Sequence, residues 1–240
     1  MFHDFFSMDS PFVRIMAKIA DFMILNLLFI VCSLPIVTMG AAITAMYDVL
    51  TRMDTRREVP AAQGFLKAFN GNFKKATKLW LIVLAVIAFL CFDIYLMLVK
   101  VPAKLTTQVT LIIIFVVMIF VWIMVAGYAF VLQARMENPL GRTIKMSFAL
   151  TLVHLIPNSI FAAVLNLLPL AMMLLFTQLF FAIFPVWLFG GIPCLCYVNS
   201  KIYMKILKKY VPELDDDKEV AFKPLELQEE AVETEEEVNG

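Results

Sequence analysis

Four polar side chains stand inside long apolar runs of this 240-residue chain, and their positions could support chemistry: Asn26, Asp93, His154 and Asn158. A carboxylate surrounded by lipid is costly and usually faces a cavity or a partner. Asp93 is therefore a candidate solute or proton site. The alternative is a structural carboxylate that bonds to a neighbouring helix or is hydrated from outside.

The two asparagines and the histidine also have structural alternatives. Asn26 and Asn158 could line a polar site, or they could form hydrogen bonds between helices, which is the commoner role of such amides and the role expected of Asn166 as well. His154 lies one turn before Pro157, whose missing amide leaves a carbonyl without its normal donor. The imidazole could satisfy that break, or it could respond to pH.

Signatures of enzymes are absent from the sequence. It contains no phosphate-binding loop of the Walker type, no HExxH zinc motif and no GxSxG nucleophile motif. The four cysteines lack CxxC spacing, and two histidines cannot build a histidine-rich metal site. These absences predict a protein that is not an enzyme and that has no cofactor.

Long uncharged runs indicate the elements that hold these side chains. Residues 146–200 contain no Asp, Glu, Lys or Arg, and further runs cover 22–47, 79–92 and 105–134. A helix of roughly 20 residues crosses the hydrocarbon core. The runs lack the alternation of a membrane barrel, so they predict an all-α, polytopic transmembrane bundle. The apolar share of 62% agrees.

The segment 22–47 is long for one crossing, and Pro35 divides it. We predict a hairpin with one helix at 12–33, a break at 33–35 and a second helix at 36–53. Six membrane helices result, and five remain possible if the segment crosses once. The second helix opens with small residues that permit close packing: Gly40, Ala41, Ala42 and Ala45.

The remaining helices are predicted at 62–100, 105–136, 139–175 and 178–210. Pro157 and Pro169 should bend the third of these. The last contains Pro185, the Gly190-Gly191 pair and Pro193, so it should be irregular.

An aromatic stripe with flanking lysines marks the start of the helix predicted at 62–100. Phe65, Phe69 and Phe73 recur every four residues, and Lys74 and Lys75 occupy other faces. This pattern suits the inner membrane interface. It would also suit a docking surface for a cytosolic partner. The alternative without a partner is a helix that lies against lipid headgroups or against its own bundle.

Charge divides the chain into two parts. Residues 1–211 hold 18 Lys and Arg against 8 Asp and Glu, whereas residues 212–240 hold 2 Lys against 12 acids. We predict a transmembrane domain over 1–211 and an acidic, disordered tail over 212–240. The tail could simply be solubilising, or it could dock on a basic partner or on the chain's own basic loops.

The basic residues also predict an orientation. Sixteen of the 18 in residues 1–211 fall on one side of the six-helix arrangement, and only Lys100 and Lys104 fall on the other. The positive-inside rule places the larger group in the cytoplasm. The sequence therefore predicts a multi-pass protein of the cell membrane with a cytoplasmic C-terminus.

Particular strings resemble the YesL-like family of bacterial membrane proteins: NLLF at 26–29, LPIVTMGA at 34–41, TAMY at 44–47, FNGNFKKAT at 69–77 and HLIP at 154–157. The resemblance covers about 10–210 and excludes the acidic tail. That family is not biochemically characterised and has no catalytic residues to carry over. Its members are often encoded beside carbohydrate ABC importers, which implies a place in sugar uptake.

Two functions follow as hypotheses. The first is a non-catalytic accessory protein associated with carbohydrate uptake by an ABC importer, whose permease subunits would be partners alongside the lipid bilayer, with no role for nucleic acid. The second is a permease for a small, sugar-related solute. A polar cavity joining Asp93 to Asn26 or Asn158 would favour the permease, and a packed apolar interior would favour the accessory protein.

Overall fold

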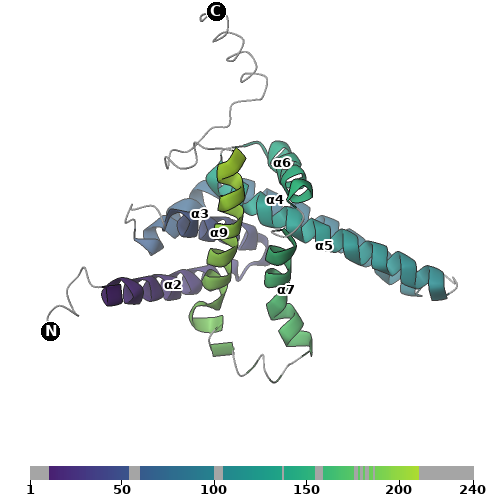
Figure 1. Ribbon diagram of the computed structural model, residues 1–240, viewed down its shortest axis with the longest axis horizontal. Coiled ribbons are helices and arrows are strands. Elements are labelled where there is room, and N and C mark those ends of the chain that lie inside the picture. The colour runs from purple at the N-terminus through teal and green to yellow at the C-terminus, as the bar shows by residue number, and fades with distance from the viewer. Residues whose placement is uncertain are drawn as a thin grey trace, which may run out of the picture.

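The computed structural model describes residues 11–53, 60–99, 105–136, 138–154, 159–175, 178, 181, 184–185 and 187–210. The regular structure of these residues is helical throughout, with seven α-helices, a 3-10 turn and a π-helical turn (Figure 1). The predicted all-α fold is confirmed.

The first two helices form the predicted Pro-broken hairpin. Helix α2 (Pro11–Ser33) ends before Pro35, η1 (Ile36–Thr38) makes the turn, and α3 (Met39–Arg52) follows. Proline lacks an amide hydrogen and disfavours helix at the preceding residue, which accounts for the break. The hydroxyl of Thr38 closes the turn by donating to the carbonyl of Cys32 over 2.6 Å.

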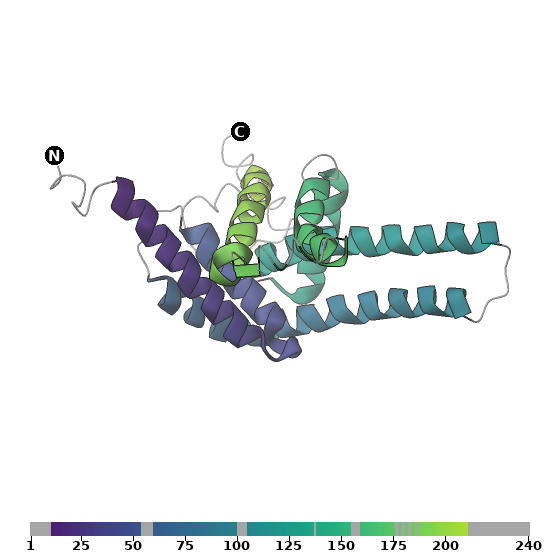
Figure 2. The same ribbon diagram turned by 90° about the horizontal axis from the view of Figure 1, so that it is seen from below.

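Helices α4 (Ala61–Val99) and α5 (Leu105–Arg135) confirm the two long helices predicted at 62–100 and 105–136. With 39 residues, α4 is about 58 Å long, nearly twice the thickness of the hydrocarbon core. The outer parts of α4 and α5 lie side by side and project away from the remaining helices (Figure 2). We call residues 84–99 and 105–123 the arm, and the other described residues the body.

The helix predicted at 139–175 is instead two helices, α6 (Leu140–Val153) and α7 (Ile160–Leu175). At the break, the carbonyl of His154 accepts hydrogen bonds from the amide of Ser159 over 3.3 Å and from its hydroxyl over 2.9 Å. Pro157 lies outside the described residues; a proline there removes one amide from the helical hydrogen-bond ladder. Helix α7 runs through position 169 without interruption.

Within the last predicted helix, 178–210, the structure describes a continuous regular helix over the second half. A π-helical turn, η3 (Trp187–Gly191), precedes α9 (Ile192–Tyr210), and Gly190 has non-helical backbone angles. The expected irregularity is confirmed where the structure describes the chain, and most of 176–186 lies outside the described residues.

Helix α3 is the centre of the body. It packs against α2, α4, α5 and α9, and 11 of its 14 residues are buried. A Cβ at Gly40 would overlap the Cβ of Trp80 and lie 2.8 Å from the carbonyl oxygen of Ala76. The indole of Trp80 donates to the carbonyl of Ile36 over 2.7 Å. The small residues at the start of α3 thus allow it to touch α4 backbone to backbone, as predicted.

Three described helices are long and apolar enough to cross a membrane: Ile15–Ser33 of α2, Ala61–Val99 (α4) and Thr106–Arg135 of α5. They indicate a multi-pass membrane protein. The predicted five or six crossings exceed this number, counted over the described residues, for two reasons. Helices α3, α6 and α7 have only 14 to 16 residues, and α9, with 19, carries four lysines. Lys100, Lys104 and the segment 212–240 lie outside the described residues, so the orientation and the disordered tail stay predictions.

Candidate functional site

A group of polar and aromatic side chains lies where α3, α5, α7 and α9 meet, and we call it the polar core. All four helices, with the residue just before α7, supply members of this group. Five members are buried, and Asn166 is half-buried. Its members are Tyr47, Tyr128, Ser159, Asn166, Asn199 and Tyr203.

Hydrogen bonds in the polar core join helices that are distant in sequence. The amide of Asn199 donates to Oδ1 of Asn166 over 2.7 Å and so connects α9 to α7. The hydroxyls of Tyr128 and Ser159 lie 3.1 Å apart and connect α5 to the start of α7. Amide and hydroxyl bonds of this kind hold membrane helices together, because lipid offers no alternative partner.

Three tyrosine rings complete the polar core. The ring of Tyr203 packs edge-on against Tyr128 and Tyr47, with centroid separations of 4.6 Å and 6.4 Å. A Cβ at Gly127 would overlap the hydroxyl of Tyr203, so the absence of a side chain there makes room for the phenol. The close approach of α5 and α9 therefore depends on one glycine.

Several amide atoms in the body are buried without a hydrogen-bond partner among the described residues. They are Oδ1 of Asn26, Oδ1 of Asn199, and both Oε1 and Nε2 of Gln133. Buried amides are usually satisfied by protein groups or by ordered water. Chemically, these atoms can accept or donate hydrogen bonds to a small hydroxylated molecule.

The structure separates the residues predicted to form one polar site. Asp93 lies on the arm, six residues before the end of α4, whereas Asn26 is buried in α2. The amide of Asn26 donates to the carbonyls of Trp187, over 3.1 Å, and of Leu188, so it fastens α2 to η3. Figure 2 shows the arm projecting away from α2.

His154 has a structural partner, and Asn158 lies outside the described residues. The imidazole Nε2 of His154 is 2.9 Å from the hydroxyl of Tyr210, and the two rings meet edge to face. This contact connects the end of α6 to the end of α9. The amide and hydroxyl of Ser159 both donate to the carbonyl of His154 at the end of α6.

The aromatic stripe of α4 runs from the core to the surface. Phe65 is fully buried and its ring stacks with that of Phe69 at 6.2 Å, while Phe69 meets the exposed Phe73 at 5.4 Å. Lys74 and Lys75 are exposed. Only the Phe73 end of the predicted docking set can therefore touch lipid or another protein.

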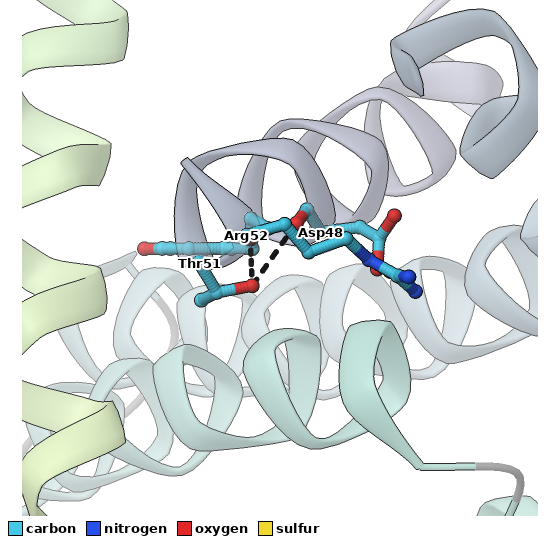
Figure 3. A network of polar contacts seen from close by, with 4 residues as sticks. Asp48, Thr51 and Arg52 are labelled. Atoms are coloured by element: carbon cyan, nitrogen blue, oxygen red, sulfur yellow. Dashed lines mark hydrogen bonds and ion pairs between the residues drawn. The ribbon is translucent and has the colours of Figure 1, made fainter. Parts of the chain in front are cut away.

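One ion pair of the body was not predicted from the sequence. Asp48 is buried on α3, and its Oδ1 lies 2.9 Å from Nη2 and 3.0 Å from Nε of Arg52, one turn later (Figure 3). The hydroxyl of Thr51 donates to the carbonyls of Tyr47 and Asp48 over 2.7 Å and 3.0 Å. The spacing of an acid four residues before a base on a helix was the available signal.

The polar core was missed too, apart from Asn166, which the sequence marked as an interhelical amide. Small residues surround Tyr128 on α5, namely Ala126, Gly127, Ala129 and Ala134. Such residues mark close helix contacts in membrane proteins. They could have shown that the second half of α5 is packed by protein.

Comparison with known proteins places one part of this arrangement in a family. Residues 22–94 match the family described as "Protein of unknown function, DUF624". No curated protein and no solved structure matches the chain. The DUF624 region covers less than a third of the chain and contains the string that resembled the YesL-like family at 34–41.

The DUF624 region corresponds to the first three α-helices that the structure describes and the turn between the first two. It begins in α2, includes η1 and all of α3, and ends near the tip of α4. It therefore includes Asn26 and Asp93, the α3–α4 contact at Gly40, and one of the two helices of the arm. The description of the family carries no activity, so any function rests on the geometry.

Proposed function

We propose that this chain is a non-catalytic accessory protein of the cell membrane that binds another integral membrane protein through the arm. The observation that supports it is the exposure of the arm. Among its described side chains, Leu90 alone is buried. A two-helix projection of this kind offers both of its helices to lipid and to a partner.

The surface of the arm combines two features of helix–helix interfaces. Ala85, Ala88 and Cys91 are exposed at spacings of three residues, which leaves a shallow strip along α4. Phe89 and Phe92 stand beside this strip and are 63% and 55% exposed. Small residues let a second helix approach closely, and neighbouring aromatic side chains add contact area.

The body supports a structural role for the buried polar residues. Asn26, Asn199 and Tyr128 each join two helices through a hydrogen bond. Asp93 stands apart from them on the arm. This separation favours an interaction protein over a transport path that would connect the carboxylate with the asparagines.

The partner class comes from the resemblance rather than from the geometry. We infer an association with an ABC importer for carbohydrates, because the strings at 34–41 and 69–77 resemble the YesL-like family. The DUF624 match supports the family domain and leaves the partner as a proposal.

The test is site-specific crosslinking in the native membrane. A photoreactive benzoylphenylalanine replaces Phe89 or Phe92 in the full chain, and Phe148, exposed at 46% on α6, is the matched control. We expect both arm positions to crosslink to a membrane subunit of an importer and position 148 to give no such product. Arm positions that yield only lipid adducts, at normal protein abundance, would refute the proposal.

A small-solute permease remains the second candidate, because the buried amide atoms of Gln133, Asn26 and Asn199 have no partner among the described residues. Asp93→Asn separates the two functions, since the amide keeps the shape of the carboxylate and loses its charge. We expect sugar uptake to persist in a strain carrying only this variant. Abolished uptake at a normal protein level would favour a proton- or cation-coupled permease.

A further inference from the structure

The amino-terminal half of α4 carries an exposed basic face. Lys67, Lys74 and Lys78 are spaced by seven and four residues, so they project from the same side of the helix, and Lys75 lies next to them. All four are exposed. Residues 61–92 contain no Asp or Glu, so nothing on this part of the helix compensates the charge.

These lysines differ from Arg52 and Lys201, which both have partners in the body. Arg52 pairs with Asp48, and Lys201 lies 5.1 Å from the ring centroid of Tyr197. In the part of the chain that the structure describes, Lys74, Lys75 and Lys78 form no ion pair, hydrogen bond or ring contact. Their positive charge is available to a ligand outside the protein.

An exposed apolar turn lies at the same level. The bond from the indole of Trp80 to the carbonyl of Ile36 places η1 directly beside the end of the lysine cluster. The predicted six-helix arrangement instead puts the turn after the first helix and these lysines on opposite sides of the membrane, so this contact argues against that part of the prediction. The side chains of Leu34, Ile36 and Val37 are 75%, 68% and 50% exposed. Trp80 itself is half-buried, and tryptophan is enriched at membrane–water interfaces.

Along α4, lysines are followed by an apolar run, in the same order in which the headgroups of a bilayer are followed by its hydrocarbon. The apolar run begins at Leu79, immediately after Lys78, and Lys74 lies only about 6 Å further along the helix axis. Three ammonium groups therefore stand at headgroup depth, while the apolar turn and the indole stand at the edge of the hydrocarbon. Flexible lysine stems can reach phosphate oxygens from this position.

We propose that Lys74, Lys75 and Lys78 form a binding site for the phosphate groups of anionic phospholipids, with the apolar turn at 34–37 inserted below them. The positive charge of the lysines favours an anionic lipid. The exposed apolar turn beside them favours a lipid in a membrane over a soluble anion, because it can insert into the hydrocarbon. Each lysine near an anionic surface contributes roughly a fivefold preference, so the three together give about a hundredfold preference.

The test uses purified full-length protein in nanodiscs and the fluorescence of Trp80. Trp122→Phe and Trp187→Phe leave Trp80 as the single tryptophan, and brominated phosphatidylglycerol or brominated phosphatidylcholine acts as the quencher. We expect phosphatidylglycerol to quench more strongly at equal mole fraction. Lys74→Gln, Lys75→Gln and Lys78→Gln together should abolish the difference.

A matched variant controls for net charge. Lys201→Gln, Lys205→Gln and Lys209→Gln remove the same charge from α9, and the preference for phosphatidylglycerol should persist. Equal quenching by both lipids in the parent protein, or equal loss in both triple variants, would overturn the proposal.

Two further measurements keep the result interpretable. Native mass spectrometry of the chain with all three tryptophans should show retained phosphatidylglycerol that the α4 triple variant loses. A preference for phosphatidylglycerol that appears only after truncation at Val211 would also overturn the proposal. It would mean that, in the full-length chain, the lysines bind the acidic segment 212–240 instead of lipid.

Discussion

The two halves of α5 are both apolar, yet they have opposite surroundings. No described side chain of residues 105–123 is buried, whereas every residue of 124–135 except Gly127 is buried. The first half is rich in Ile, Val and Phe, and the second contains Ala126, Gly127, Ala129 and Ala134. In a membrane, packing and small residues decide which apolar surface faces protein, because lipid is as apolar as the side chains.

Helix α4 shows the same contrast between a packed half and an exposed half, but here the packed half comes first in the chain. Its first half packs against α3 and buries Phe65 and Ala76, and its second half forms the arm. The body is thus held by close helix contacts and interhelical hydrogen bonds. The arm is held by the continuity of its two helices and by contacts between them, such as the 3.4 Å bond from Gln108 to the carbonyl of Met97.

The largest expected effect comes from a matched pair of phenylalanines. Phe65→Ala should lower the free energy of unfolding by about 3–5 kcal/mol, because it leaves a cavity between packed helices. Phe89→Ala on the arm should change it by less than about 1 kcal/mol, since that ring is exposed to lipid. Thermal unfolding of both purified variants in the same detergent measures the difference, and equal losses would erase the distinction between body and arm.

A pair of glycines on the body sharpens the same comparison. Gly40→Ala should destabilise by about 2–3 kcal/mol, because the new Cβ meets Trp80 and the backbone of Ala76. Gly71→Ala meets nothing within 4 Å and should stabilise α4 by about 0.5–1 kcal/mol. The unfolding midpoints should shift in opposite directions. A stable Gly40→Ala protein would show that α3 and α4 are not in backbone contact.

Smaller effects are expected from the interhelical hydrogen bonds. Asn26→Leu removes the donor to the carbonyls of Trp187 and Leu188, and it should cost about 1 kcal/mol. The control Thr110→Val lies on the arm and loses only a bond to its own helix, so its stability should be unchanged. A denaturant titration of the two variants provides the comparison, and a neutral Asn26→Leu would argue for a ligand-binding role of that amide.

Local sequence features predicted much of the fold. The missing amide of Pro35 placed the hairpin break, and the uncharged runs at 79–92 and 105–134 indicated α4 and α5. The bounds predicted for these two helices agree with the described bounds to within one residue. These features act on the chain within a few residues of themselves. The same local reasoning failed at 139–175, where a bend was predicted and the chain separates into α6 and α7.

The candidate site was less predictable, because it depends on which helices become neighbours. The stripe at Phe65, Phe69 and Phe73 marked one face of α4 but could not show that its first ring is fully buried while its last is exposed. The pairing of Asn166 with Asn199 joins positions 33 residues apart on separate helices. Asp93 was the most conspicuous polar residue by composition, and the structure places it on the arm rather than with the buried amides.

The central claim is that the arm faces lipid and partner while the second half of α5 is enclosed by the other helices of the body. Full-length protein in a bilayer can be labelled with a lipid-soluble diazirine, photolysed, and mapped residue by residue by mass spectrometry. We predict labelling around all faces of residues 106–123 and an abrupt loss of label from Met124 to Arg135. Labelling that continues past Met124 with a helical period, or an unlabelled arm, would contradict this account.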